Sequence, residues 1–303
     1  MGRAILAYIM TLLMATGAAV AGASAVDAAK AALAAKDDAS AIKLTTNALG
    51  EAGTSKADAT ALHVIRGQAY LAEEQFDDAV ADFNAVIDPS AAPTDVCAAS
   101  GDVFVFRGDA YVGLRRFRDG SEDFKRALLC EPENAIVRLK LGGAYFYFDK
   151  TSAVGAFNEA IRLKPDYKEA FVSRGQNFEN MQEFDKALAD YGEVLRLDPD
   201  DARTYNNRAT IYSALGRLDE ALADYNKSIK LKPTDFMSFL NRAYLYYWKK
   251  DYKAARADVE KAKQLRADPK AKPDLIKLSN SPFLKRVDAD MAQLDEDLAN
   301  APP

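Results

Sequence analysis

The sequence predicts an all-α protein, an α-solenoid of tandem antiparallel helix pairs that ends in a capping helix. Two observations support this prediction. Small residues recur with a period of 34 in the second half of the chain, at Gly175, Ala209 and Ala243. Within one period, apolar residues are spaced three, four and seven apart, which places them on one face of a helix. A fixed period of this length indicates a repeat array, in which each repeat is stabilised by its neighbours.

Each period contains two amphipathic helices joined by a turn. In the copy from 168 to 201, Phe171 and Gly175 share a face of the first helix, and Ala187 and Tyr191 share a face of the second. Pro199, which lacks an N–H group, ends the second helix. Gly175 and Ala187 are small, so we expect them where the two helices come closest.

Several copies of one motif resemble the tetratricopeptide repeat (TPR) family. The copies are Phe171-x2-Arg174-Gly175-x2-Phe178 with Ala187-x3-Tyr191 and Pro199, then Tyr205-x2-Arg208-Ala209-x2-Tyr212 with Ala221-x3-Tyr225 and Pro233. The resemblance implies a right-handed α-solenoid of helix pairs. It also implies that the first helix of each pair lines a concave groove, which usually holds a peptide or a partner protein. The resemblance does not identify that partner.

We expect seven helix pairs, of which the first is degenerate and covers residues 26–55. The six TPR pairs cover about 60–93, 101–134, 135–167, 168–201, 202–235 and 236–269. Between the second and third pairs we expect a loop at residues 89–99, because the period is lengthened there. The fourth pair has one residue fewer in the turn between its helices.

Residues 1–25 have the features of a signal peptide, which indicates an exported bacterial protein. Arg3 gives a positive start, residues 4–21 are largely apolar, and Ala23-Ser24-Ala25 has the small-x-small form that signal peptidase accepts. We predict cleavage after Ala25 and a periplasmic or secreted protein. The alternative is an uncleaved anchor in the inner membrane with the repeats facing the periplasm, since spanning a bilayer takes about 20 apolar residues.

A last amphipathic helix is expected at residues 281–299. Its apolar residues step by three and four along one narrow stripe, which must be covered. They are Leu284, Val287, Met291, Leu294 and Leu298. We interpret this helix as a cap on the seventh pair. Two alternatives are a helix that occupies the groove as an internal ligand and a coiled-coil dimer.

Composition and motifs disfavour several classes of function. The chain has 45 acidic and 40 basic residues and no basic run that would attract a nucleic-acid backbone. His63 is the only histidine, so it supports neither a His/Asp/Ser triad nor a histidine-based zinc site, and we expect it to be a packed core ring. Residues 198–201 are acidic but lack the Gly and the distal Glu of a calcium loop. We therefore predict no catalysis, no metal and no cofactor.

Two columns of opposite charge run through five of the six TPR pairs, and the fourth pair has Leu141 and Ala156 at these two positions. Because both charges are missing together, we infer that each Arg contacts an Asp, either within its pair or in the neighbouring pair. The alternative is a stripe of arginines that binds anions. The two columns are Arg66, Arg107, Arg174, Arg208 and Arg242, and Asp82, Asp123, Asp190, Asp224 and Asp258.

Two cysteines in an exported chain suggest a disulfide. Cys97 precedes the expected first helix of the third pair, and Cys130 lies near the end of its second helix. Antiparallel helices place these two ends side by side. The bond would close a loop of about 34 residues and pin the insertion. The alternative is two independent thiols.

The groove is where we expect a ligand to bind. First-helix residues at the second, fifth, ninth, twelfth and thirteenth positions of each pair should line it. Those of the fifth and sixth pairs are largely polar, which suits hydrogen bonds to an extended peptide. Those of the seventh pair are largely aromatic, which suits either an apolar anchor or packing under the C-terminal helix. The candidates are Gln176, Glu179, Asn180, Arg203, Asn206, Thr210, Leu240, Tyr244, Tyr247 and Trp248.

The sequence thus predicts a non-catalytic scaffold that binds a protein or peptide of unknown identity. A membrane-anchored assembly factor is the alternative within this class, if residues 1–25 are retained. An enzyme is the alternative from another class. It would need a base and a nucleophile together in the groove, and His63 is expected elsewhere.

Overall fold

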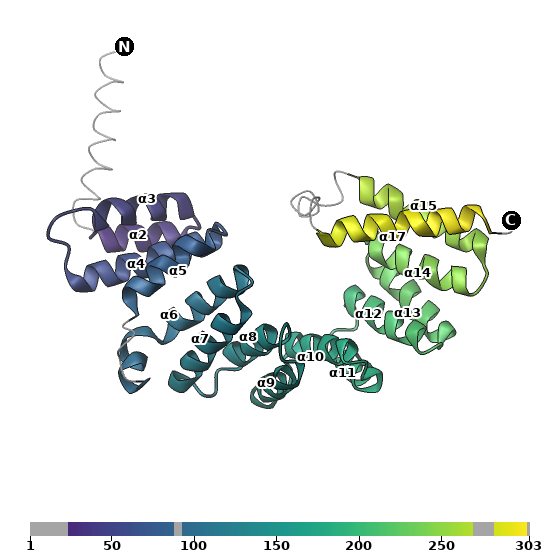
Figure 1. The fold of residues 1–303 in the computed structure, drawn as a ribbon, viewed down its shortest axis with the longest axis horizontal. Coiled ribbons are helices and arrows are strands. Elements are labelled where there is room, and N and C mark those ends of the chain that lie inside the picture. Colours follow the sequence, from purple (N-terminus) through teal and green to yellow (C-terminus); the bar gives the residue numbers. More distant parts are fainter. Residues whose placement is uncertain (1–23, 88–92, 269–281, 302–303) are drawn as a thin grey trace, which may run out of the picture. The chain divides into compact units, whose positions relative to one another are not determined.

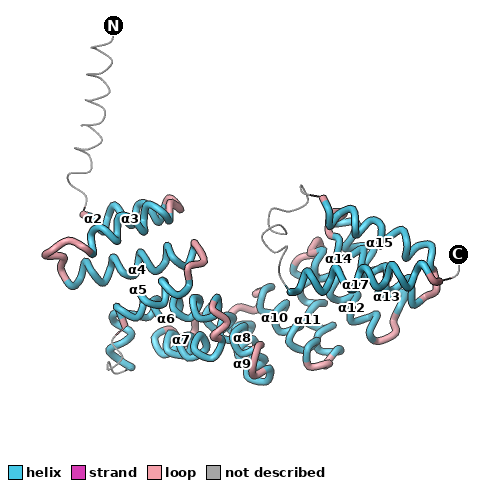
Figure 2. The backbone as a smooth tube through the Cα atoms, turned by 45° about the horizontal axis from the view of Figure 1, so that its top comes forward, coloured by secondary structure: helices cyan, strands magenta, loops and turns pink. Residues whose placement is uncertain are grey.

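The computed structural model describes residues 24–87, 93–268 and 282–301 (Figures 1 and 2). Every regular element in these ranges is a helix, as the sequence predicts. The chain divides into two compact units, residues 1–164 (unit 1) and residues 165–303 (unit 2). In each unit the described helices form successive antiparallel pairs.

Unit 1 contains four pairs in its described part, and helices adjacent in sequence pack on one another. Its first helices also touch from pair to pair, α2 on α4 and α4 on α6. The helices are α2 (Ala25–Ala34) and α3 (Asp38–Leu49), α4 (Lys56–Ala72) and α5 (Phe76–Val86), α6 (Pro93–Gly113) and α7 (Phe117–Cys130), and α8 (Ala135–Tyr145) and α9 (Lys150–Leu163).

Unit 2 contains three pairs and a final helix in its described part. The helices are α10 (Lys168–Asn180) and α11 (Phe184–Leu197), α12 (Ala202–Ala214) and α13 (Leu218–Leu231), α14 (Phe236–Trp248) and α15 (Tyr252–Ala267), and α17 (Pro282–Ala299).

One predicted connection is largely wrong. The sequence predicts a loop over residues 89–99, but α6 begins at Pro93. Proline is well accepted at the first position of a helix, because the N–H group there has no partner inside the helix. Residues 93–100 therefore lengthen the first helix of the third pair by about two turns.

Most pairs share one turn geometry between their helices. In six of them a residue in the left-handed region, with φ between 58° and 72°, follows the first helix, and only the sixth pair uses glycine there. The six residues are Lys36, Glu74, Arg115, Gln182, Gly216 and Lys250. The shorter turn of the fourth pair closes differently: the Asp149 N–H donates to the Tyr145 carbonyl at 2.7 Å, and the Asp149 side chain caps α9.

In the second to fifth pairs, the two helices come closest where a glycine of the first helix faces an aromatic ring of the second. A Cβ atom added to Gly67, Gly108, Gly142 or Gly175 would lie 2.4–2.9 Å from the ring of Phe83, Phe124, Phe157 or Tyr191, respectively. A methyl group does not fit at that distance. In the sixth and seventh pairs, Ala209 and Ala243 take the same position and are fully buried. The prediction that small residues lie at the closest approach is therefore correct.

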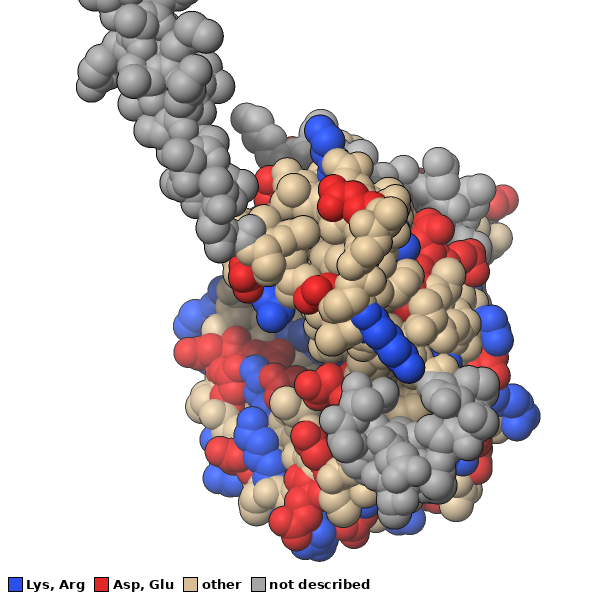
Figure 3. Space-filling model, turned by 90° about the vertical axis from the view of Figure 1, so that its left-hand side faces the viewer, with Lys and Arg blue, Asp and Glu red and all other residues tan. Residues whose placement is uncertain are grey.

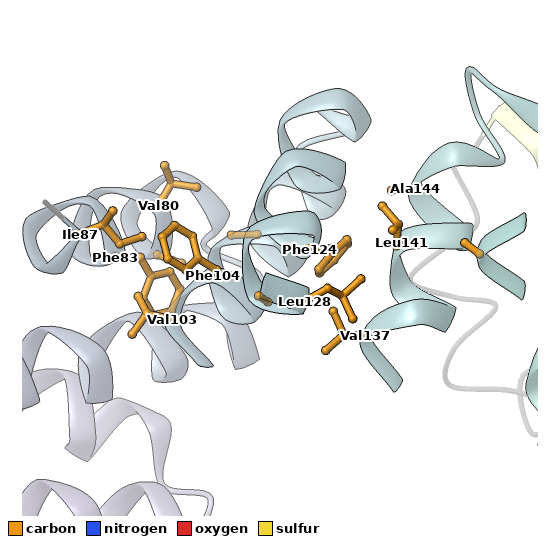
Figure 4. Packing of buried hydrophobic residues seen from close by; sticks show 14 residues of the cluster. Val80, Phe83, Ile87, Val103, Phe104, Phe124, Leu128, Val137, Leu141 and Ala144 are labelled. Atoms are coloured by element: carbon orange, nitrogen blue, oxygen red, sulfur yellow. The ribbon is translucent and has the colours of Figure 1, made fainter. Parts of the chain in front are cut away.

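Neighbouring pairs share a continuous core. In unit 1, Phe83 of α5 packs near Phe104 of α6, and Phe124 of α7 packs near Val137 and Leu141 of α8 (Figure 4). Each layer therefore contributes apolar surface to the layers on both sides, as a repeat array requires.

The C-terminal helix α17 packs on the last pair of unit 2. Met291, Leu294 and Leu298 are buried in one cluster with residues of α14 and α15. The helix packs mainly on α15 and less on α14. In the same way, α14 packs mainly on α13 and less on α12 of the preceding pair. It thus takes the position that the first helix of an eighth pair would take.

Candidate functional site

The two charged columns meet inside each of the five pairs. In every case the arginine Nε and Nη2 donate to the two carboxylate oxygens of the aspartate 16 residues later, at 2.6–2.9 Å. The bonds are Arg66–Asp82, Arg107–Asp123, Arg174–Asp190, Arg208–Asp224 and Arg242–Asp258. Because each guanidinium group makes two parallel bonds to a buried carboxylate, its role is structural. The alternative of an anion-binding stripe of arginines is therefore disfavoured.

Some of these arginines also reach the preceding pair. Arg107 Nη1 donates to Asn84 of α5 at 2.6 Å, and Arg242 Nη1 donates to Asn226 of α13 at 2.6 Å. The Arg–Asp pair therefore connects successive layers as well as the two helices of one layer.

The single histidine differs from the prediction. His63 is not a packed core ring, because 26% of its side chain is exposed and its Nδ1 lies 2.8 Å from Asp82 Oδ1. It joins the Arg66–Asp82 pair as a third member. The fourth pair has no Arg–Asp ion pair, since the two positions hold the buried apolar residues Leu141 and Ala156.

The predicted disulfide stays a prediction, because the side chain of Cys97 lies outside the described residues. Residue 97 is one helical turn before Gly101 in α6. A Cβ atom added to Gly101 would lie 3.6 Å from the Cβ of Cys130. The described part of α6 thus passes directly beside Cys130 at the end of α7.

The candidates on α10 and α12 form internal hydrogen bonds. Glu179 Oε2 accepts from the Tyr191 hydroxyl at 3.0 Å, and the Asn180 amide donates to the Gln176 carbonyl at 2.9 Å. Asn206 Oδ1 accepts from Asn241 Nδ2 at 3.1 Å. These contacts hold the side chains in place on the face of the first helices.

Two further candidates on α12 differ in exposure. Thr210 Oγ1 donates to the Asn206 carbonyl at 3.1 Å and lies 3.2 Å from the Tyr225 hydroxyl. Arg203 is exposed. We call the surface formed by Gln176, Glu179, Arg203, Asn206 and Thr210 the first-helix face of unit 2.

The candidates on α14 are largely used by the fold. Leu240 is a core residue with 3% exposure, so it does not line an open groove. Tyr244 donates from its hydroxyl to the Asp290 carbonyl of α17 at 2.8 Å, and Tyr247 packs edge-on against Tyr252. Trp248 remains 57% exposed. At the aromatic end of the predicted groove, Tyr244 is therefore bound to α17, while Trp248 stays open to solvent.

A cavity of about 380 Å³ lies between the N-terminal halves of α12 and α14. It is lined by two candidates, Arg203 and Asn206, and by Met237, which stands at the second position of the seventh pair and was therefore expected in the groove. Asn207 and Lys232 also line it. Asp235 also lines it and caps α14 through the Ser238 N–H. The cavity thus presents amide and cationic donors, the Asp235 carboxylate and the apolar side chains of Ala202 and Met237.

The sequence analysis also missed the two tyrosine hydroxyl groups that reach the first-helix face, those of Tyr191 and Tyr225. Their signal was present in the chain. The same column holds Phe83, Phe124 and Phe157 in the second to fourth pairs, so a change to tyrosine in two successive pairs adds a polar group at one place.

Other sites can be checked in the described residues. No group of three or more His, Cys, Asp or Glu side chains there is placed to hold a metal ion. None of the helices in the described ranges combines the length and apolar composition that crossing a bilayer takes. On the face drawn in Figure 3, acidic and basic side chains are interspersed.

The fold and the first-helix face define an α-solenoid of the class that presents a helix-lined surface to protein partners. Its repeats are similar to tetratricopeptide repeats. Family models described as tetratricopeptide repeat match residues 107–168 and 202–235, and a model described as TPR repeat matches residues 180–216. These matches agree with the motif copies in the sequence.

Solved structures show the same fold. A tetratricopeptide repeat protein from Parabacteroides merdae is 16% identical, with a TM-score of 0.63 over 84% of this chain and 96% of its own. The C-terminal part of a TPR repeat-containing protein from Cytophaga hutchinsonii is 18% identical, with a TM-score of 0.60 over 80% of this chain and 96% of its own. A MamA protein is 24% identical, with a TM-score of 0.51 over 58% of this chain and 93% of its own. No curated protein matches the sequence.

Proposed function

We propose that this chain is a non-catalytic TPR scaffold of an exported compartment, and that it binds a protein or peptide on the first-helix face of unit 2. The observation that supports this most directly is the cavity between α12 and α14. Its amide and cationic groups are suited to the carbonyl and carboxylate groups of an extended peptide. The five arginines of the charged column do not contribute to this site, because each is bonded to an aspartate of its own pair.

The cavity combines anchoring with selectivity. Asn206 Oδ1 accepts a hydrogen bond from Asn241, which fixes the orientation of the Asn206 side-chain amide. Side chains that are ordered before binding lose little conformational entropy when a ligand arrives. Arg203 and Lys232 add positive charge at the same place, which favours a ligand segment that carries an acidic group.

A binding assay tests this proposal. The probe is an immobilised library of ten-residue peptides, and the readout is the dissociation constant of the best binders in solution. We expect Arg203→Ala and Asn207→Ala to weaken binding about tenfold each, as loss of a charged or polar contact of about 1.4 kcal/mol would do. Arg196→Ala is the matched control, because Arg196 is an exposed residue of α11 paired with Glu193. Unchanged binding by both cavity variants, or no binding by the wild type, would refute the proposed site.

Export is the second part of the proposal, and it rests on residues 1–25 of the sequence. Ser24 lies at the start of α2, where its Oγ accepts from the Asp27 N–H at 3.1 Å and its own N–H donates to Asp27 Oδ2 at 3.3 Å. Cleavage after Ala25 would remove this cap, at a cost of about 1 kcal/mol. That cost is small for a repeat array, whose stability comes mainly from contacts between layers.

The mass of the protein recovered from the exporting cell separates cleavage from anchoring. A mature chain that begins at Val26 supports the cleaved, periplasmic or secreted form. A chain that retains Tyr8 and fractionates with membranes supports the alternative, a membrane-anchored assembly factor.

A further inference from the structure

The ring that faces the small residue of each pair changes type along the chain. It is Phe83, Phe124 and Phe157 in the second to fourth pairs, and Tyr191 and Tyr225 in the fifth and sixth. Both tyrosine rings are buried, yet their hydroxyl groups reach the first helix. The Tyr191 hydroxyl donates to Glu179, and the Tyr225 hydroxyl lies against Thr210.

The first helices change in step with these rings. The position of Glu179 is occupied by Leu71, Val112 and Phe146 in the phenylalanine pairs and by Ser213 in the sixth pair. Phenylalanine makes the same contact with the first helix in three pairs, so packing alone does not require a hydroxyl. The tyrosines and their polar neighbours therefore form one feature, supplied by α10 to α13 (Figure 1).

Glu179 carries a charge that the fold does not neutralise. The side chain is half-buried, and burial raises the pKa of this carboxyl, against the opposing effect of the Tyr191 hydrogen bond. In the described part of the chain, no lysine or arginine forms an ion pair with Glu179. Arg203 lies near enough to lower the pKa of Tyr191, against the larger opposite effect of burial. A half-buried carboxylate without a cation is costly, and a cation that arrives with a ligand relieves that cost.

Of the hydroxyl-bearing side chains on the next pair, Tyr225 is buried and Thr210 is half-buried. Burial raises the pKa of Tyr225, and the hydrogen bond with Thr210 acts in the opposite direction. The charge of Glu179 also raises the pKa of Tyr225. Hydroxyl oxygens accept hydrogen bonds from ammonium and guanidinium groups without adding a second charge.

We infer that Glu179, held in place by the buried Tyr191 hydroxyl and accompanied by the half-buried Thr210, forms a subsite for the side chain of a lysine or arginine in the bound ligand. This inference rests on the proposed function and deepens it. The ligand would carry a basic residue at this subsite and an acidic group near the cavity of Arg203 and Lys232. The spacing of opposite charges would then set the direction in which the peptide lies.

Matched peptides test the subsite. The probes are peptides that the wild type binds, each remade with Lys, Arg, Gln or Glu at every position in turn. We expect one position at which Lys or Arg binds at least tenfold more tightly than Gln. In Glu179→Gln, which keeps an oxygen to accept from Tyr191, this preference should fall below twofold. Glu220→Gln is the control, because Glu220 is an exposed acid on the second helix of the sixth pair, paired with Arg217, and it should keep the preference.

A second measurement does not depend on peptide binding. The carbon chemical shift of the Glu179 carboxyl is followed by NMR while N-acetyl-arginine amide is added, with N-acetyl-glutamine amide as the control. A saturable shift with the arginine compound alone supports the subsite, provided that the side-chain amide carbon at this position in Glu179→Gln shows no such shift. Circular dichroism and thermal unfolding of Glu179→Gln establish that the variant is folded.

The two measurements separate the two proposals. If peptides bind without preference for a basic residue and the arginine compound gives no shift, the subsite is overturned while the proposed function stands. If no peptide binds but the arginine compound shifts Glu179, the subsite stands and the proposed function fails. If neither probe binds, both are overturned.

Discussion

The third and fourth pairs, both in unit 1, close by the same contact but differ in what is added to it. In the third pair Gly108 faces Phe124, and in the fourth Gly142 faces Phe157, at nearly the same distance. The third pair adds the buried Arg107–Asp123 ion pair. The fourth has the apolar residues Leu141 and Ala156 at those positions. The glycine–ring contact is thus sufficient to close a pair, and the ion pair is an addition that a pair can lack.

The predicted disulfide of the third pair should make the largest contribution to the difference in stability between the two pairs. If Cys97 and Cys130 are bonded, the loop they close stabilises the fold by about 3–4 kcal/mol in the loop-entropy model. We expect dithiothreitol to lower the free energy of unfolding by that amount and to have no effect on Cys130→Ser. Thiol counting on the oxidised, denatured protein provides the check, since two free thiols would exclude the bond.

Removing one member of the ion pair should have the next largest effect. Asp123→Ala leaves the Arg107 guanidinium buried without its carboxylate, and we expect a loss of about 3 kcal/mol in urea unfolding. Glu122→Ala, on the exposed side of the same helix, should change stability by less than about 0.5 kcal/mol. Equal effects from the two substitutions would show that the ion pair contributes little.

The glycine–ring contact can be tested inside the fourth pair alone. Gly142→Ala places a methyl group 2.4 Å from the buried Phe157 ring, so we expect a loss of about 2 kcal/mol. Gly143 is the matched control, because an added Cβ there meets nothing within 4 Å. Gly143→Ala should stabilise by up to about 1 kcal/mol through helix propensity. Similar unfolding midpoints for the two variants would contradict the contact.

Introducing the Arg–Asp ion pair into the fourth pair should have the smallest effect on stability. Leu141→Arg and Ala156→Asp, made together, place the missing charges at the positions that the other five pairs use. Each single change should destabilise the protein, and the double variant should be more stable than their sum by about 1 kcal/mol. A double-mutant cycle measures this coupling energy, and a value near zero would mean that the fourth pair cannot accommodate the ion pair.

The helix pairs could be predicted from sequence because their signals are local. The 34-residue period, the small residues that face rings and the alternation of Arg and Asp are all encoded in residues that pack within one or two layers. Residues 93–99 were predicted as a loop and are helical in the structure, because Pro93 is compatible with both a loop and a helix start.

The candidate site was harder to predict, because a register shows which way a side chain points and not what covers it. Leu240 and Tyr244 occupy groove positions, but α17 covers that end and accepts a hydrogen bond from Tyr244. Glu179 was identified as a groove residue from its position alone. Its half-buried state depends on Tyr191 of the second helix, which lies on a different column of the repeat.

The final helix also determines how the array meets its surroundings. Each layer offers apolar surface to the next, so an open end would favour concatenation of one molecule onto another. The buried stripe of α17 covers this surface, and its exposed side carries Asp290, Asp295 and Glu296. A second molecule therefore meets polar side chains at this end of the array, in place of the apolar surface on which another helix pair would stack.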